Sequence, residues 1–201
     1  MLALILAGGK GCRLGKGEKP LAMICGSPMI NYVIDAFTCA GHEPVVIASP
    51  NCPFTANWCR AQQISLYTAQ GLGYIEDLVE AGCALEAEGP LFTCVADLPL
   101  LTPGIIHGID QEYRKRGTPA ASVWIPATFP GSTDRHRDYA DEVSGTLAYP
   151  VGINMLRGDQ IAKPQEESRI LSRDFRLAYN VNTPGDLERV RQVLCTTGNH
   201  I

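Results

Sequence analysis

Short apolar runs alternate with amphipathic segments of helical length, and this alternation constrains the fold more than any other feature of the sequence. The expected strands are residues 2–7, 45–48, 64–67, 91–96 and 120–125, and the expected helices are 28–40, 55–63, 74–88 and 103–116. Strands joined through helices form right-handed crossovers, which build a parallel sheet covered on both faces. A chain of 201 residues can bury one good core. We therefore predict a single α/β domain over residues 1–201, with three Rossmann-like layers and a mainly parallel central sheet.

The pattern weakens after residue 125. Residues 127–145 are polar and aperiodic, which predicts a long functional loop. Residues 147–155 are apolar again and suit an antiparallel strand. Near the end, residues 178–182 are expected to form a strand that leads into a capped helix containing Leu187, Val190 and Leu194.

Two helix starts are expected from the same capping pattern. Ser27 and Thr102 are each followed by proline, which favours the first position of a helix. We expect Ser27 and Thr102 to be the N-caps of their helices.

Composition excludes several classes of protein. Seventeen basic and 21 acidic residues give a net charge of −4, which disfavours a nucleic-acid partner. No apolar run is long enough to span a bilayer. The apolar start of the chain precedes the basic residues rather than following them, so it is expected to be a buried strand and not a signal peptide. We accordingly expect a cytoplasmic protein.

The eight cysteines lack the spacing of a zinc site. In a cytoplasmic protein they are expected to be reduced and mostly packed in the core. Cys12 differs, because the cations around it could lower the pKa of its thiol.

The loop after the first strand combines glycines with cations. Lys10, Arg13, Lys16 and Lys19 lie within ten residues, among several glycines. A P-loop does not fit, because the count from Gly11 to Gly17 is wrong and a glycine stands where Ser or Thr must hold the metal. A dinucleotide-binding loop does not fit either, because Leu14 stands at the position of its last glycine. The remaining interpretation is a loop whose backbone N–H groups and cations bind phosphate.

Asp97 follows the strand at residues 91–96. Ligands of parallel α/β sheets bind beyond the carboxyl ends of the strands, so Asp97 is expected to face the glycine-rich loop. A carboxylate there suits a hard cation such as Mg²⁺.

These motifs carry a resemblance to a known family. Leu6-Ala-Gly-Gly-x-Gly-x-Arg-x-Gly with Lys19-Pro20 resembles the signature of nucleotidyltransferases, and Asn180-Val-Asn-Thr-Pro resembles a segment of molybdenum-cofactor guanylyltransferases. Four further segments resemble the archaeal-type GTP:adenosylcobinamide-phosphate guanylyltransferase family more closely. They are residues 17–20, 73–78, 152–154 and 182–183.

The resemblance implies a set of site residues. It implies that Arg13, Lys19 and Asp97 are catalytic and that Asp97 and Asn182 hold Mg²⁺. The residues implied to bind the nucleotide are Leu6, Ala7, Gly8, Gly9, Lys10, Gly11, Ser49, Asn51 and Thr68. Gly152 and Asn154 are implied to bind the acceptor. Glu76 and Asp77 could contact the ribose or merely begin a helix.

The function implied is transfer of GMP from GTP to adenosylcobinamide phosphate, in cobalamin biosynthesis, with release of pyrophosphate. Its partners would then be GTP and adenosylcobinamide phosphate, and a homodimer is left open. Alternatives are a molybdopterin guanylyltransferase, a sugar-1-phosphate nucleotidyltransferase, or a catalytically idle nucleotide sensor. Because the acceptor phosphate is already anionic, no covalent intermediate is expected, and Cys12 should tolerate replacement by serine.

Overall fold

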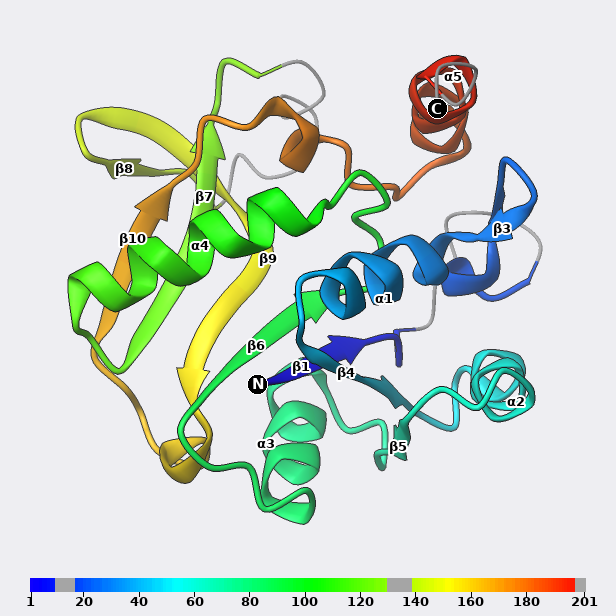
Figure 1. Ribbon diagram of the computed structural model, residues 1–201, viewed down its shortest axis with the longest axis horizontal. Helices are drawn as coiled ribbons and strands as arrows, with labels where there is room; N and C mark the ends of the chain where they lie inside the picture. Colours follow the sequence, from blue (N-terminus) through cyan, green and yellow to red (C-terminus); the bar gives the residue numbers. More distant parts are fainter. Residues whose placement is uncertain (10–16, 130–138, 198–201) are drawn as a thin grey trace.

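The computed structural model describes residues 1–9, 17–129 and 139–197, and a mixed β-sheet forms its centre (Figure 1). Within these residues the sheet has eight strands, in the order β10-β7-β9-β6-β1-β4-β5, with β8 paired to β9. The strands are β1 (Leu2–Leu6), β4 (Glu43–Ala48), β5 (Leu66–Thr68), β6 (Pro90–Val95), β7 (Ala120–Pro126), β8 (Asp141–Val143), β9 (Thr146–Arg157) and β10 (Glu167–Leu171). A separate hairpin joins β2 (Met23–Ile24) to β3 (Ser27–Pro28).

The first half of the sheet is parallel, as the sequence predicts. Strand β1 pairs in parallel with β4 and β6, and β4 pairs in parallel with β5. Strand β9 is antiparallel to both β6 and β7, which confirms the antiparallel strand expected at residues 147–155.

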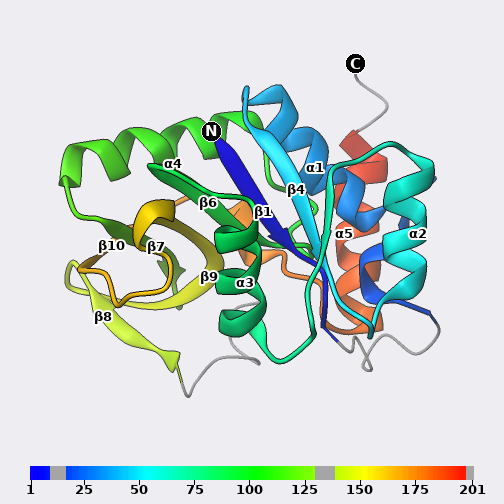
Figure 2. The ribbon, with the colours of Figure 1, turned by 90° about the horizontal axis from the view of Figure 1, so that it is seen from below.

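Helices cover both faces of the sheet (Figures 1 and 2). The helices are α1 (Met29–Cys39), α2 (Pro53–Ala61), α3 (Tyr74–Ala84), α4 (Pro103–Arg116) and α5 (Pro184–Thr197), with 3₁₀ turns η2 (Lys19–Leu21), η4 (Gly158–Gln160) and η5 (Phe175–Ala178). Helices α1 and α4 lie on one face and α3 on the other. The predicted three-layer α/β fold is confirmed.

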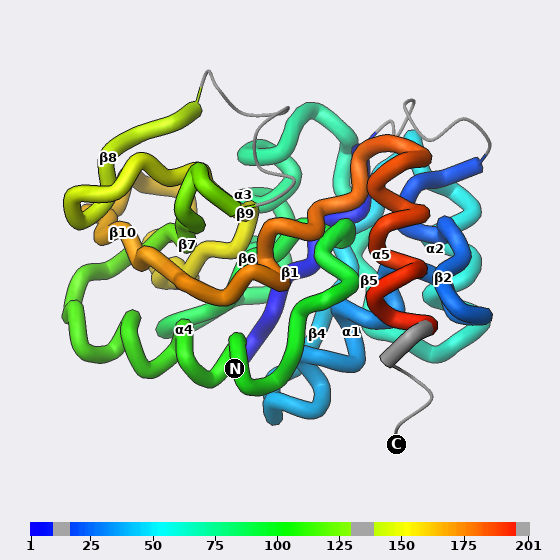
Figure 3. Tube along the Cα trace, turned by 90° about the horizontal axis from the view of Figure 1, so that it is seen from above, coloured from blue at the N-terminus to red at the C-terminus, as the bar shows by residue number. Residues whose placement is uncertain are grey.

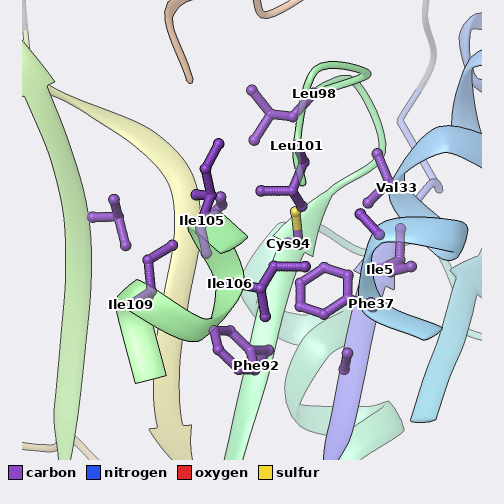
Figure 4. Packing of buried hydrophobic residues seen from close by; sticks show 14 of the residues in the cluster. Ile5, Val33, Phe37, Phe92, Cys94, Leu98, Leu101, Ile105, Ile106 and Ile109 are labelled. Carbon is purple, nitrogen blue, oxygen red and sulfur yellow. The ribbon is translucent and has the colours of Figure 1, made fainter. Parts of the chain in front are cut away.

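The two cores follow from the alternation of side chains along β1. Ile5 points to the face of α1 and α4, where Phe37, Phe92 and Ile106 are fully buried (Figure 4). Leu4 points to the opposite face and packs in the cluster with α3. Because β1 is buried on both faces, its sequence is a continuous apolar run.

Only one of the two expected N-caps is confirmed. Thr102 caps α4 as expected, accepting a hydrogen bond from the Ile105 N–H. Ser27 does not cap α1: it pairs with Ile24 in the small hairpin, and α1 begins at Met29.

Three predictions for the second half of the chain also differ from the structure. Part of the loop predicted at 127–145 is strand β8, and residues 130–138 lie outside the described residues. The strand expected at residues 178–182 does not form: the 3₁₀ turn η5 ends at Ala178, and residues 179–182 are irregular. Strand β10 was not expected, since Ile170 is its only buried residue.

One pair of cysteines differs from the expected reduced state. Cys25, in the β2–β3 hairpin, forms a disulfide with Cys195 in α5, across 170 positions of sequence. The expectation of reduced thiols is therefore wrong for this pair. Cys52, Cys59 and Cys94 are buried free thiols, as expected, but Cys39 and Cys83 are exposed, so the expectation of core packing is wrong for these two.

No helix in the described part of the chain is long and apolar enough to cross a membrane.

Candidate active site

A cavity of about 580 Å³ opens at the carboxyl ends of β1 and β6. This is the edge at which parallel α/β sheets bind ligands. The lining residues come from the ends of strands, from the start of α3 and from the segment before α5; they are Leu6, Ala7, Gly8, Gly9, Lys19, Pro20, Met29, Asn51, Gly71, Gly73, Tyr74, Asp77, Val95, Ala96, Asp97 and Asn182. Eight residues that the sequence analysis singled out for catalysis, metal or nucleotide binding are in this set.

Lys19 lies at the centre of the polar contacts in the cavity. Its ammonium group forms an ion pair with the Asp97 carboxylate and donates a hydrogen bond to Asn182 Oδ1 at 2.7 Å. The Lys19 and Asp97 side chains are only 17% and 15% exposed. Three residues that are far apart in the sequence, and that were predicted as catalytic or metal-binding, therefore meet at one point.

Asn180 completes this cluster and was missed as a site residue. Its Nδ2 donates to Asp97 Oδ1 at 2.8 Å, and its Oδ1 accepts a hydrogen bond from Asn182 Nδ2. The backbone N–H of Val181 also donates to the Asp97 carbonyl, at 3.0 Å. Positions two apart in an extended segment share a face, so the spacing of Asn180 and Asn182 already indicated that they lie together. That this face meets Asp97 follows only from the fold.

The segment that carries the asparagines is fixed by the start of α5. Asp186 accepts hydrogen bonds from the backbone N–H groups of Asn182 and Thr183, at 2.9 and 2.7 Å, and Thr183 Oγ1 accepts from the Asp186 N–H in return. This reciprocal arrangement is a capping box. Val181, which stands between Asn180 and Asn182 in the sequence, is fully buried. Figure 3 shows the chain crossing from β10 to α5 past the loop after β6.

Glu18 fixes the other side of the cluster. Its carboxylate accepts hydrogen bonds from the backbone N–H groups of Phe54 and Thr55, at 2.8 and 2.6 Å, and so caps α2. A carboxylate at a helix N-terminus is stabilised by the unpaired N–H groups and the helix dipole. Because Glu18 precedes Lys19, this cap anchors the residue that carries the ammonium group.

Gly8 permits a close approach between β1 and β4. A Cβ atom at Gly8 would lie 3.1 Å from the Ser49 Cβ. The Ser49 hydroxyl donates to the Gly8 carbonyl at 2.8 Å and accepts from the Asn51 N–H at 3.2 Å. Ser49 does not line the cavity; it shapes the backbone that does, whereas Asn51 lines it directly.

Thr68, Gly152 and Asn154 are not among the cavity-lining residues. Thr68 is exposed at the end of β5. Asn154 donates to Thr93 Oγ1 at 3.1 Å. Gly152 has a φ of +79°, and a Cβ there would come within 2.9 Å of the Val95 side chain. Gly152 therefore lies behind Val95, which itself lines the cavity.

Tyr74 and Asp77 also line the cavity. Tyr74 was not expected to be a site residue, and the sequence left open whether Asp77 contacts the ribose or only begins a helix. The Tyr74 hydroxyl is hydrogen-bonded with Thr93 and Asn154, and burial of that group raises the pKa of Tyr74. Asp77 Oδ1 accepts from the N–H groups of Gly71 and Leu72, at 2.9 and 3.0 Å. Asp77 thus holds the loop before α3, in addition to lying in the first turn of the helix.

Lys10, Gly11, Cys12, Arg13 and Lys16 lie outside the described residues. The phosphate-binding role predicted for this part of the loop stays a prediction.

The oxygen atoms of Asp97 and Asn182 fit a hard cation. Within the described residues no group of three or more His, Cys, Asp or Glu side chains could hold a metal. However, carboxylate and amide oxygens from Asp97 and Asn182 converge on the positively charged Lys19 Nζ. A divalent ion that keeps several water or phosphate ligands needs only one or two such protein oxygens.

Comparison with known proteins adds three findings. Residues 3–153 match the family described as the MobA-like NTP transferase domain. The adenosylcobinamide-phosphate guanylyltransferase of Methanocaldococcus jannaschii is 32% identical over 209 aligned residues, covering 98% of this chain and 100% of that protein. A probable molybdenum cofactor guanylyltransferase of Thermococcus gammatolerans is 30% identical over 60% of each chain.

A solved structure of CMP:2-keto-3-deoxy-manno-octonic acid synthetase, complexed with CTP, has a similar fold. Its TM-score is 0.70, and the match covers 98% of both chains at 18% identity. At this identity the likeness concerns the fold.

Proposed function

The chain belongs to the MobA-like NTP transferase family, and we propose that it transfers GMP from GTP to adenosylcobinamide phosphate. The full-length relative with this activity in its name supports the choice of substrates. The proposed chemistry rests on one observation: Lys19 contacts both Asp97 and Asn182 in the cavity at the carboxyl ends of β1 and β6.

The proposed reaction is a single in-line displacement. An oxygen of the acceptor phosphate forms the new bond to the α-phosphorus of GTP, while the bond from that phosphorus to the bridging oxygen breaks. The bonding electron pair leaves with pyrophosphate. Because the attacking oxygen is already anionic at neutral pH, the main barrier is the approach of two anions, which positioned cations lower.

Lys19 is proposed to supply that positive charge at the α-phosphate. It is part-buried, so its charge is screened less than that of a surface lysine. Gly8 and Gly9 line the same cavity and would let the backbone approach the phosphates. Arg13 and Lys10 are proposed, from the resemblance, to bind the remaining phosphates.

Asp97 and Asn182 are proposed to hold Mg²⁺. When bound, the ion would offset negative charge on the triphosphate. Asn180 would keep the Asp97 carboxylate oriented through its hydrogen bond to Oδ1. Lys19 would then exchange its contact with Asp97 for one with phosphate.

No thiol nucleophile is part of the proposal. Burial raises the pKa of Cys94 and of Cys52, so both thiols stay protonated at neutral pH. Their positions next to the site are therefore explained by packing.

The nucleotide and acceptor subsites remain as the resemblance implies them. Leu6, Ala7 and Asn51 line the cavity on the β1–β4 side and are proposed to contact the nucleotide. Ser49 is proposed to act through the backbone of Gly8 and Asn51. For Thr68, which does not line the cavity, and for Gly11, which lies outside the described residues, the nucleotide-binding role rests on the resemblance alone. Gly152 and Asn154 are proposed to shape the acceptor side through Val95 and Tyr74.

A nucleotide and acceptor panel tests the function. Purified protein with MgCl₂ is given GTP, ATP, CTP or UTP together with adenosylcobinamide phosphate, molybdopterin or glucose 1-phosphate. Pyrophosphate release is measured, and the products are identified by mass spectrometry. We expect turnover with GTP and adenosylcobinamide phosphate, giving adenosylcobinamide-GDP. Preferred turnover with either of the other acceptors would overturn the proposal.

A further inference from the structure

The loop that leads into α3 is tied to that helix through its own backbone. The N–H groups of Gly71 and Leu72 both donate to Asp77 Oδ1, at 2.9 and 3.0 Å. The N–H of the preceding residue, Gln70, donates to Glu80 Oε2 at 3.1 Å, one turn further along the helix. Asp77 is buried, and hydrogen bonds to a charged group are stronger than those between neutral groups. The conformation of the loop therefore depends on Asp77 most of all.

The same loop packs tightly against the segment that follows β4. Gly71 has a φ of +78°, and a Cβ atom there would lie 3.3 Å from Ser49 Cβ, 3.3 Å from Pro50 Cδ and 3.4 Å from Asn51 Nδ2. Such an approach favours glycine, which has no Cβ and tolerates a positive φ. Gly71 and Asn51 both line the cavity. By fixing the loop, Asp77 thus holds two lining residues against each other.

Charge distinguishes this wall of the cavity from the end at Lys19. Among the described residues that line the cavity, Lys19 is the one with a cationic side chain. Glu76 and Asp77 place two carboxylates in the first turn of α3, where a helix N-terminus would otherwise attract phosphate. The loop N–H groups that could bind an anion are already bound to Asp77. Phosphate therefore suits the Lys19 end, and the wall formed by Gly71 and Asn51 suits an uncharged nucleoside.

We infer that Asp77 is a positioning residue for the nucleoside end of the bound nucleotide. It keeps Gly71 against Asn51, so the wall is already formed when the nucleotide arrives. Such preorganisation raises affinity, because the loop loses less conformational freedom on binding. The inference rests on the proposed function, which supplies GTP as the nucleotide. Asp77 acts on nucleotide binding and not on the chemical step at Lys19.

Two substitutions separate the hydrogen bonds of Asp77 from its charge. Asp77→Ala removes the acceptor of both loop N–H groups, whereas Asp77→Asn keeps a side-chain oxygen that can accept them. Calorimetry with MgCl₂ gives Kd for GTP. We expect Asp77→Ala to raise this Kd about tenfold and Asp77→Asn to restore it to within about threefold of the wild-type value. The effect should appear in Kd for GTP and not in kcat at saturating substrates, a split that general destabilisation would not produce.

Gly71→Ala disturbs the same wall from the loop side, and it keeps the inference testable if Asp77→Ala does not fold. The added Cβ forces the loop away from Ser49 and Asn51, so Kd for GTP should again rise about tenfold. Gly41→Ala is the matched control. Gly41 has a φ of +77° but does not line the cavity, and a Cβ there would meet no described atom within 4 Å beyond its chain neighbours. It carries the same backbone strain and should leave Kd for GTP unchanged.

Inorganic pyrophosphate probes the phosphate end alone. Its Kd, measured by calorimetry with MgCl₂, should be unchanged in Asp77→Ala and Gly71→Ala and should rise in Lys19→Ala. An unchanged Kd for GTP in either folded wall variant would overturn the inference, as would weaker GTP binding by Gly41→Ala or weaker pyrophosphate binding by Asp77→Ala. If the wild-type protein prefers another nucleoside triphosphate, it is the proposed function that fails, and the same variants are then measured with that nucleotide.

Discussion

Lys19 and Asp97 compensate each other's charge inside the cavity, and each also contacts an asparagine from the segment before α5. Removing one member of a part-buried ion pair leaves the other without a partner, which is more costly than the pair's net contribution to stability. At this site the two charges also have separate roles in the proposed reaction.

We expect Lys19→Ala and Asp97→Ala each to lower kcat by roughly 10² or more, the scale of losing one preorganised charge in a transition state. Pyrophosphate release under saturating substrates measures the effect. Lys163→Ala removes an exposed lysine remote in sequence from the motifs and should turn over like the wild-type protein. Near-normal kcat in folded Asp97→Ala protein would contradict the proposed role of the carboxylate.

At the residue scale, the sequence predicted the charged groups better than their supports. Lys19, Asp97 and Asn182 stand in recognisable motifs, and the structure brings them together. Asn180 and Glu18 lie in the same motifs, but their contacts depend on backbone conformations that a linear pattern does not specify. Their roles therefore became visible only in three dimensions.

At the scale of elements, α5 and the segment before it form one unit. Asp186 is 3% exposed and accepts hydrogen bonds from Asn182 and Thr183, and it also forms an ion pair with Arg189. The start of the helix therefore determines where Asn182 points.

We expect Asp186→Ala to lower the free energy of unfolding by about 1–2 kcal/mol, the usual loss for a helix cap. Urea unfolding monitored by circular dichroism measures this change. Glu188→Ala, on the exposed side of the same helix, should change stability by no more than about 0.5 kcal/mol. Equal stability of the two variants would show that the cap does not hold the segment.

The elements that were predicted correctly are those with strong periodicity. Strand β1 is buried on both faces, and α4 has a clear N-cap at Thr102 and stops at Gly117. Strand β10 lies at the edge of the sheet, where its sequence carries almost no apolar signal. Ser27 carried the signal of a cap, but pairing in the hairpin outweighed this local preference.

At the scale of the whole molecule, the Cys25–Cys195 disulfide links the hairpin after Lys19 to the helix after Asn182. Around it Ile24, Met29 and Val190 form a small core, and Arg191 donates two hydrogen bonds to the Met23 carbonyl. Cysteines so far apart in sequence could not be paired without the fold.

Closing a loop of 170 residues restricts the unfolded chain strongly. We expect Cys25→Ser/Cys195→Ser to lower the free energy of unfolding by about 2–4 kcal/mol. Urea unfolding with and without reductant measures it: reductant should destabilise the wild-type protein and leave the variant unchanged. Identical unfolding of the oxidised and reduced wild-type protein would contradict this prediction.

Thiol reactivity reports the packing of the whole chain. In Cys12→Ser protein, a thiol-specific reagent at pH 8 should label the exposed Cys39 and Cys83 quickly. Cys52, Cys59 and Cys94 should react only on unfolding, because they are buried and burial raises the pKa of Cys59 to about 11. Mass spectrometry of digested, labelled protein gives the sites, and fast labelling of Cys94 in native protein would contradict the packing.

A crystal structure of the protein with GTP and Mg²⁺ tests the proposed site most directly. We expect the α-phosphate to lie within ion-pair distance of Lys19 and the metal to be bound by oxygen atoms of Asp97 and Asn182. A nucleotide bound elsewhere, with the contact between Lys19 and Asp97 unchanged, would contradict it.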